Sequence, residues 1–217
     1  MLKRRLFLAF SGVDGSGKTT QVQLLEKRLR EANFHVTTVW CRWRPVLSLP
    51  LLSILERLGY AKTRATSSIG FVETRISNLG GLAFLWSLLT QIDNFMKNGL
   101  KVMIPLFLGR TVICDRYVLD MLVEGMAGLH DPPNRVRLGY RLLGLLPRPD
   151  NAFLIEMDPA VAFERKPDMP TLSHFAERVS LYRELARAMR VRTIDGRLPI
   201  QAIHGEIWAK VSRALHS

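Results

Sequence analysis

The sequence predicts a doubly wound α/β fold, in which a mainly five-stranded parallel sheet carries helices on both faces. Short apolar segments rich in β-branched and aromatic residues alternate along the chain with longer segments whose apolar residues recur at helical spacing. This alternation is typical of parallel strands joined by crossover helices. The length of 217 residues and the hydrophobic content of 47% suffice for a sizeable core. We therefore expect a single domain over residues 1–217.

The first predicted strand, residues 6–10, leads into a glycine-rich loop and then into a helix over residues 18–33. The loop fits the phosphate-binding pattern G-x-x-x-x-G-K-[ST] in both spacing and context. Its glycines let the backbone wrap closely around a triphosphate, and N–H groups at the helix start point at the phosphate oxygens. Lys18 would reach the β- and γ-phosphates, and the Thr19 hydroxyl would ligate Mg²⁺. The predicted phosphate-binding residues are Gly12, Gly15, Ser16, Gly17, Lys18, Thr19 and Thr20.

A second strand is predicted over residues 35–41, and it ends in Arg42-Trp43-Arg44-Pro45. In parallel α/β sheets, ligands bind beyond the carboxyl ends of the strands. Arg42 and Arg44 are therefore placed where an anionic substrate would lie, although solvated arginines are also common at such turns.

The middle of the chain is predicted to be mostly helical. Residues 46–62 favour an apolar helix that ends near Gly59, and residues 62–70 favour an exposed polar loop. A long apolar helix then continues to Leu106, with a break or kink expected at Gly99 and Pro105. Its apolar stripe suits either core packing or a homodimer interface.

The third predicted strand begins at Thr111 and ends in Asp115-Arg116-Tyr117. A buried strand of this kind delivers its last carboxylate to the edge of the sheet that carries the phosphate loop. We expect Asp115 to hold Mg²⁺, or water bound to it, beside Thr19. Arg116 follows at the same edge.

The rest of the chain continues the alternation of helix and strand. The expected helices cover 117–125, 134–146, 159–165 and 173–190, with one more from residue 199, and the expected strands cover 151–157 and 191–196. Proline at position 159 suits the first turn of its helix. The proline-rich segment 168–172 is expected to be a loop.

Composition narrows the classes of function. The net charge of +12 and the pI near 10.4 suit a protein that handles anions, although they also serve solubility. The basic residues are not interleaved with aromatic ones, so no nucleic-acid partner is expected. Two cysteines, Cys41 and Cys114, without a Cys-x-x-Cys pair indicate a reducing cytoplasm and no metal–thiolate site. The apolar stretches fall short of a bilayer span, so no membrane partner is expected.

With these motifs assembled, the chain resembles the thymidylate kinase family, within the P-loop nucleoside monophosphate kinases. The segments that carry the resemblance are residues 10–21, Val112-Ile113-Cys114-Asp115-Arg116-Tyr117, 158–165, 182–186 and Ile194-Asp195-Gly196. The resemblance implies transfer of the γ-phosphoryl group of ATP to the 5′-phosphate of a pyrimidine deoxynucleotide, with dTMP the expected acceptor and Mg²⁺ the metal. It also implies a homodimer.

The resemblance assigns roles to particular residues. Asp14 would lie beside the acceptor, Arg116 would hold the acceptor phosphate together with the adjoining Tyr117, and Asp115 would help to place Mg²⁺. A short lid around residues 165–178 would supply Arg165 to the transferring phosphoryl group, as an arginine finger does. The expected catalytic residues are Lys18, Asp14, Arg116 and Arg165.

Several positions depart from the family pattern. Ser11 stands where a glutamate is common, and Arg42-Trp43-Arg44-Pro45 replaces an Arg-Glu-Pro-Gly-Gly type of turn. We expect Arg42 or Arg44 to take over acceptor binding. The middle helix lacks the usual base-contacting arginine, and Gln91 or Asn94 is the candidate to read a base edge there.

Two other classes of function stay open. A kinase of the same fold could act on a different nucleotide, a nucleoside or another small phosphorylated acceptor. A P-loop ATPase associated with nucleic acid is the second alternative, whereas a guanine-nucleotide switch is disfavoured because no Asn-Lys-x-Asp segment occurs.

Overall fold

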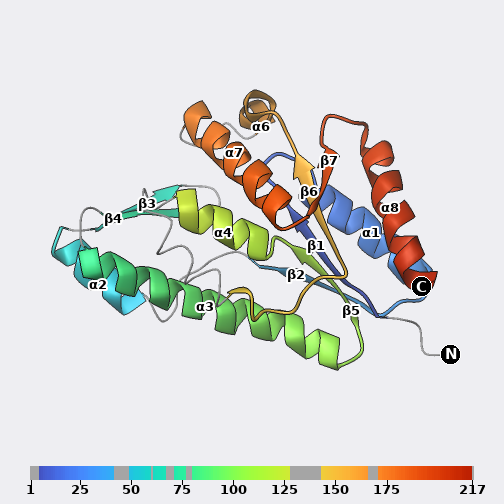
Figure 1. Cartoon of the computed structure of the whole chain (residues 1–217), viewed down its shortest axis with the longest axis horizontal. Helices are drawn as coiled ribbons and strands as arrows, with labels where there is room; N and C mark the ends of the chain where they lie inside the picture. Colours follow the sequence, from blue (N-terminus) through green and yellow to red (C-terminus); the bar gives the residue numbers. More distant parts are fainter. Residues whose placement is uncertain are drawn as a thin grey trace.

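The computed structural model describes residues 5–41, 49–59, 61–66, 71–76, 80–127, 143–165 and 171–216. The described chain forms a five-stranded parallel sheet with helices on both faces and a separate two-stranded antiparallel sheet (Figure 1). The order of the five strands is β2 (Val36–Trp40), β5 (Thr111–Asp115), β1 (Phe7–Ser11), β6 (Asn151–Glu156) and β7 (Arg192–Asp195). The predicted fold class, a doubly wound sheet of five parallel strands, is confirmed.

β1 lies at the centre of the sheet and is hydrogen-bonded to strands that come much later in the chain. Leu8 is in register with Ile113 of β5 on one side and with Asn151 of β6 on the other. Within this sheet the chain therefore passes from β1 to the edge strand β2, then to β5 between them, and then to β6 and β7 on the other side of β1. The phosphate loop follows β1 at this switch point, where α/β sheets open a crevice for ligands.

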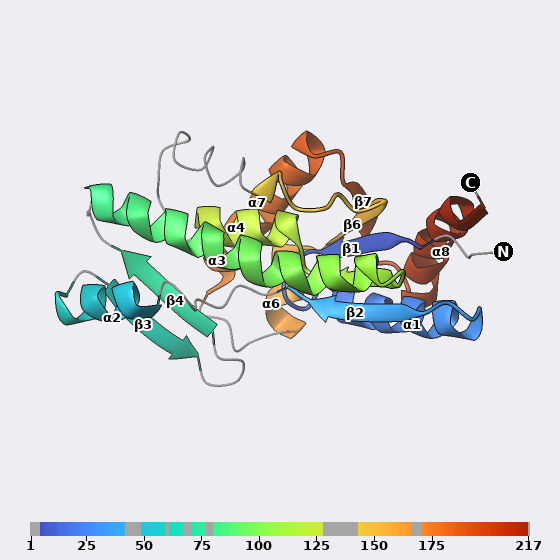
Figure 2. The same cartoon turned by 90° about the horizontal axis from the view of Figure 1, so that it is seen from below.

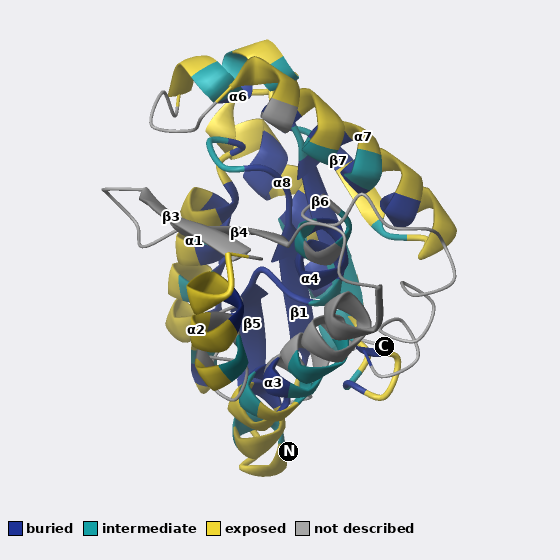
Figure 3. Cartoon of the chain, turned by 90° about the vertical axis from the view of Figure 1, so that its left-hand side faces the viewer, coloured by how far each residue is buried: buried dark blue, intermediate teal, exposed yellow. Residues whose placement is uncertain are grey.

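The two faces of the sheet have separate hydrophobic cores because side chains alternate along each strand. Along β1, Phe7 and Ala9 belong to one core, and Leu8 and Phe10 to the other. Phe10 stacks on Phe153 of β6 with ring centroids 5.2 Å apart. Figure 3 shows the strands buried between helices whose outer faces are exposed.

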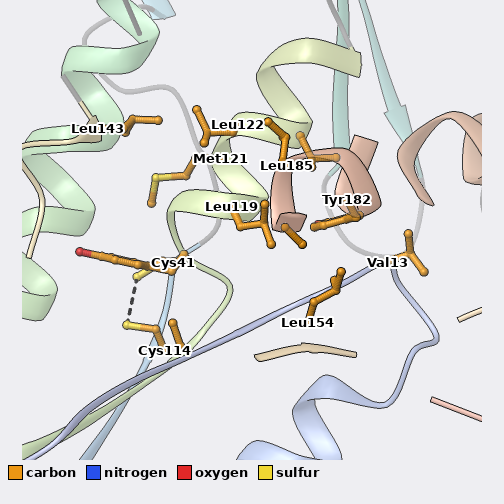
Figure 4. Packing of buried hydrophobic residues seen from close by; sticks show 14 of the residues in the cluster. Val13, Cys41, Cys114, Leu119, Met121, Leu122, Leu143, Leu154, Tyr182 and Leu185 are labelled. Carbon is orange, nitrogen blue, oxygen red and sulfur yellow. Dashed lines mark hydrogen bonds between the residues drawn. The ribbon is translucent and has the colours of Figure 1, made fainter. Parts of the chain in front are cut away.

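One face is covered by α1 (Lys18–Glu31) and α8 (Ile200–His216), which carry the apolar side chains of the second core. The other face is covered by α3 (Gly80–Phe107), α4 (Val118–Ala127), α6 (Pro159–Arg165) and α7 (Leu172–Ala188). In this core, Tyr182 and Leu185 of α7 lie near Val13 and Leu154 (Figure 4). The same core contains Cys41 and Cys114, whose sulfur atoms are 3.9 Å apart.

Residues 62–66 belong to a strand, so the prediction of a loop is wrong for them, whereas residues 67–70 of that predicted loop lie outside the described residues. β3 (Ala61–Thr66) pairs in antiparallel register with β4 (Phe71–Ile76), and the hairpin lies beside α2 (Leu49–Arg57), as Figure 2 shows. Two β-branched threonines of β3 favour an extended backbone despite the polar composition. The segment forms a strand because it pairs with β4, which begins five residues after β3 ends.

α3 continues through Gly99 and Pro105 to Phe107, so the helix is not broken at these residues, and a kink there stays a prediction. Pro105 lies two residues before the end of the helix, where a lost N–H bond affects only the last turn. Gly99 allows close packing, since a β-carbon on it would lie 3.0 Å from Cδ2 of Leu146. The predicted helix 134–146 falls mostly outside the described residues. No described helix is long and apolar enough to cross a membrane.

Candidate active site

The loop after β1 is held tightly against two neighbouring elements. Gly12 has φ +142°, and a β-carbon there would lie 2.5 Å from the carbonyl oxygen of Ile155 in β6. Gly15 has φ +82°, and its β-carbon would lie 2.9 Å from the carbonyl oxygen of Ala162 in α6. A side chain at either position would displace the loop, which explains the need for glycine.

This loop forms one wall of a pocket of about 600 Å³ at the carboxyl edge of the sheet. The pocket is lined by Asp14, Gly15, Ser16, Gly17, Lys18, Thr19, Thr20, Gln21, Trp40, Asp115, Arg116, Arg165, Gly196, Leu198, Ile200 and Ile203. The structure thus brings together most of the residues predicted to bind phosphate, metal and acceptor. Gly12 lies behind the loop, against β6.

Lys18 lies at the start of α1 and is 5% exposed. Its Nζ donates a hydrogen bond to the carbonyl oxygen of Val13 at 2.8 Å, inside the curl of the loop. Burial, followed by the positive charge of Arg116, lowers the pKa of Lys18 from 10.5 to about 8. An anion in the pocket would supply the negative charge that favours the protonated ammonium.

Thr19 and Asp115 form the part of the pocket that suits a divalent cation. The Thr19 hydroxyl donates to Oδ2 of Asp115 at 2.6 Å. The other carboxylate oxygen, Oδ1, is buried without a hydrogen-bond partner. A hydroxyl and a carboxylate are ligands that Mg²⁺ prefers, so these residues fit the predicted metal. Among the described residues no group of three or more acidic, histidine or cysteine side chains is arranged to hold a metal ion.

Arg116 is the buried cation beside this pair, directly after β5. Its backbone has φ +72°, a left-handed conformation that costs a non-glycine residue about 1–3 kcal/mol. Its N–H donates to the carbonyl oxygen of Phe10 at 2.8 Å, which ties it to β1. The guanidinium group donates to Asp14 through Nη2 and to Asp120 through Nη1. Burial alone would lower the pKa of Arg116, but Asp14 and Asp120 hold it above its usual value.

Arg165 approaches the loop from α6. Its Nη1 donates to the carbonyl oxygen of Gly15 at 3.2 Å, and its side chain lines the pocket. The rest of the predicted lid divides between residues 166–170, which fall outside the described residues, and the first turns of α7.

Other predicted acceptor residues are not brought to the pocket by the described structure. Tyr117 donates its hydroxyl to the carbonyl oxygen of Pro147 at 2.9 Å and lines a separate cavity of about 480 Å³, so it does not face the loop. Gln91 and Asn94 belong to α3, but their side chains lie outside the described residues. Arg42 and Arg44 also lie outside them.

Sequence reasoning missed several residues at the site. Trp40, at the end of β2, lines the pocket and is 42% exposed, and an aromatic residue at a strand's carboxyl end could have drawn attention. Leu198 and Ile200 line the side next to α8, after the Ile194-Asp195-Gly196 segment. Asp120 and Tyr182 contact Arg116 or its neighbours from α4 and α7, and no local pattern indicates that contact.

A phosphate loop at the centre of a parallel sheet, with an Asp-Arg pair delivered by the adjacent strand, defines the class of P-loop nucleoside monophosphate kinases. Comparison with known proteins narrows the class. The chain is 30% identical over 228 residues to a thymidylate kinase of Deinococcus radiodurans, an alignment that covers 99% of this chain and 100% of the relative. It therefore belongs to the thymidylate kinase family, as the sequence motifs predicted.

Further relatives support the same membership at lower identity. A thymidylate kinase of Symbiobacterium thermophilum is 25% identical over 226 residues, which cover 97% of this chain and 94% of the relative. A probable thymidylate kinase of Methanocaldococcus jannaschii is 27% identical over 210 residues, covering 93% of each chain. No protein-family model matches the chain.

Proposed function

We propose that this protein transfers the γ-phosphoryl group of ATP to the 5′-phosphate of dTMP, giving ADP and dTDP. The observation that carries the proposal is that the hydrogen-bonded pairs Thr19–Asp115 and Asp14–Arg116 line one pocket together with Lys18. The Thr19–Asp115 pair suits a metal-bound phosphate donor, and the Asp14–Arg116 pair suits an anionic acceptor. The named activity of the full-length relatives supports dTMP as that acceptor.

On the donor side, the loop amides and Lys18 would bind the phosphates of ATP. Thr19 and Asp115 would hold Mg²⁺, which neutralises charge on the β- and γ-phosphate oxygens when it is bound. The loop geometry prepares this binding, because the helix N-terminus directs its free N–H groups into the pocket. Lys18 adds a positive charge that is already buried before the nucleotide arrives.

On the acceptor side, Arg116 would bind the phosphate of dTMP, and Asp14 would lie beside its sugar. Arg165 would approach the γ-phosphoryl group from α6, and its guanidinium can stabilise charge in the transition state. Phosphoryl transfer has a loose transition state, so positioning the two phosphates between fixed cations is the main contribution that these side chains make.

Base recognition rests on residues whose side chains the structure does not describe. We propose Gln91 or Asn94 of α3 for the base edge and Arg42 or Arg44 for further contacts to the acceptor. All four residues stand at positions where the chain departs from the family pattern. The cytoplasmic location likewise stays a prediction from cysteine usage.

A coupled assay of ADP release tests the proposal. The protein is supplied with ATP and Mg²⁺ and with dTMP, dUMP, UMP, CMP, AMP or GMP, and the reaction without acceptor gives the background. We expect stimulation by dTMP well above that by the others. ATP hydrolysis that needs no monophosphate acceptor and increases when DNA is added would favour a nucleic-acid ATPase instead. Stimulation by another monophosphate would reassign the acceptor.

We also propose that the protein is a homodimer that associates through α3. Exposed apolar side chains recur along one side of this helix at i, i+4, i+7, i+8 and i+11, namely Met96, Leu100, Met103, Ile104 and Phe107. Their spacing forms a continuous stripe, and a second copy can bury the same stripe about a two-fold axis.

Sedimentation or light scattering measures this association. Leu100→Asp should give a monomer, because it places a charge in the middle of the stripe. Leu172→Asp, an equally charged change at an exposed apolar residue of α7, is the matched control and should stay dimeric. A wild-type monomer at micromolar concentration would overturn the proposal.

A further inference from the structure

Asp120 takes no part in the reaction as proposed above, yet it has the most deeply buried carboxylate among the described residues. It lies in the first turn of α4 and is 1% exposed. Removing a carboxylate from water costs several kcal/mol unless its oxygens gain compensating partners. The partners of Asp120 therefore indicate what this burial accomplishes.

Four groups from three parts of the fold donate to the two oxygens of Asp120. Oδ1 accepts from the Tyr182 hydroxyl at 2.7 Å, from Nη1 of Arg116 at 3.3 Å and from the N–H of Gly12 at 3.4 Å. Oδ2 accepts from the N–H of Tyr117 at 3.0 Å. One carboxylate thus joins the phosphate loop, the strand end that carries Arg116, and α7.

We infer that Asp120, held by Tyr182, is the positioning group that fixes Arg116 for the phosphate of the acceptor. The inference deepens the proposed function and rests on it. Among the described residues, Arg116 has two carboxylate partners, and they differ in access: the Asp14 side chain is 25% exposed and lines the pocket, whereas that of Asp120 is 2% exposed. An incoming phosphate can compete with Asp14 for Nη2, but it cannot reach the bond between Nη1 and Asp120.

Arg116 needs such an anchor because its side chain is long and its charge must stay at one place. An arginine loses up to about 2 kcal/mol of rotamer freedom when it is immobilised, and a pre-positioned guanidinium has lost that freedom before the ligand binds. The left-handed backbone at Arg116 directs the side chain, and Asp120 fixes its end.

Tyr182 supports this anchor without neutralising Arg116. Its hydroxyl and the two backbone N–H groups share the charge of Asp120, so the guanidinium remains attractive to a second anion. Tyr182 is 3% exposed and comes from α7, which packs against α4. The position of Arg116 is therefore coupled to the helix that follows the predicted lid.

A purely structural role for Asp120 makes a different prediction. Its bond to the N–H of Tyr117, three residues earlier, matches half of a helix capping box, and a cap contributes about 1 kcal/mol to stability. If capping were the whole role, replacing Asp120 would lower the melting temperature and leave the Michaelis constants of both substrates unchanged.

Steady-state kinetics with ATP and dTMP separate these roles. The set comprises Asp120→Asn, Tyr182→Phe, Arg116→Ala and the double variant Arg116→Ala/Asp120→Asn. Asp120→Asn should raise the KM for dTMP about tenfold and Tyr182→Phe about threefold, with the KM for ATP within about twofold of wild type. In the Arg116→Ala background, Asp120→Asn should change the KM for dTMP by less than about twofold, because it acts through Arg116.

Glu31→Gln is the matched control. It removes one carboxylate at the exposed end of α1, about 20 Å along the helix from Lys18, and should leave all constants at wild-type values. Circular dichroism and thermal unfolding check that each variant is folded. If Asp120→Asn does not fold, the KM for dTMP of Tyr182→Phe tests the inference.

Two results would overturn the inference while leaving the proposed function in place. One is an unchanged KM for dTMP in Asp120→Asn and Tyr182→Phe when Arg116→Ala raises it. The other is a double variant whose loss equals the product of the two single losses. A wild-type response to dTMP in Arg116→Ala would instead refute the proposed acceptor site, and the role of Asp120 with it.

Discussion

Lys18 should make the use of ATP sensitive to alkaline pH. Burial, followed by the like charge of Arg116, lowers the pKa of its ammonium group to about 8 in the free protein. With that pKa, about nine-tenths of the molecules carry the charge at pH 7 and about one-tenth at pH 9. The value of kcat/KM for ATP, which reports the free protein, should therefore fall about tenfold between these pH values.

Bound phosphates should shift this dependence. Their negative charge favours the protonated ammonium, so the fall in kcat, which reports the nucleotide complex, should begin at a higher pH than the fall in kcat/KM. The coupled assay gives the profile of kcat/KM for ATP from pH 6.5 to pH 10 when dTMP is held well below its KM, so that the free protein is the form measured. It gives the profile of kcat when both substrates are saturating, with the coupling enzymes shown to be in excess at each pH.

Lys18→Arg is the control for this assignment. Arginine keeps its charge throughout the range, so the alkaline fall near pH 8 should disappear even if the absolute rate is lower. A wild-type kcat/KM for ATP that stays level to pH 9.5, or a fall that persists in Lys18→Arg, would refute the reasoning.

The same pKa predicts how the stability of the free protein depends on pH. Between about pH 8 and pH 10.5 the unfolded chain holds a proton on Lys18 that the folded chain has released. The free energy of unfolding should therefore rise with pH across this window, by about 3 kcal/mol in total from this group. Urea unfolding of the wild type and of Lys18→Met, compared at each pH, isolates that contribution, and parallel pH profiles for the two proteins would contradict it.

Four further substitutions test the glycine positions, the core packing and the metal site. Gly12→Ala should lose ATP binding and about 1–3 kcal/mol of stability, because its β-carbon would lie 2.5 Å from the Ile155 carbonyl oxygen. Gly205→Ala, in the open interior of α8, should instead stabilise the fold by about 0.5–1 kcal/mol. Calorimetry measures ATP binding, and urea unfolding measures the stability of both variants. Asp115→Asn should raise the Mg²⁺ concentration needed for half-maximal activity by about tenfold or more, and an unchanged requirement would place the metal elsewhere. Phe153→Ala should cost about 3–5 kcal/mol in urea unfolding, since the ring is 1% exposed and stacks on Phe10, and a loss below about 1 kcal/mol would show that the core refills the space.

Local sequence pattern was sufficient for the central fold. The two strands β1 and β5 at the middle of the sheet carry apolar runs that are buried on both faces, and the glycines of the phosphate loop mark a backbone that only glycine tolerates. Pattern and tertiary environment agree at these positions, so the strand that delivers Asp115 and Arg116 could be predicted from the residues around it.

Other parts depend on contacts that sequence does not display. The polar strand β3 is extended because β4 pairs with it, and α3 passes Pro105 because the helix ends two residues later. Asp120 is hydrogen-bonded to residues 108 positions before it and 62 positions after it. The neighbouring sequence predicts only that this carboxylate caps a helix. Its position beside Arg116 becomes visible only in the folded structure.

The central position of β1 also governs when the site can form during synthesis. Residues 7–11 emerge early, but the second strand that pairs with them, β6, ends at Glu156. At a translation rate of about 5–20 residues per second, the N-terminal strand waits about 7–30 s for that partner. Until then the apolar segment Phe7-Leu8-Ala9-Phe10 has an open edge, the kind of surface that chaperones bind and that aggregates when exposed. A site placed at the switch point of the sheet is thus completed only late in the life of the nascent chain.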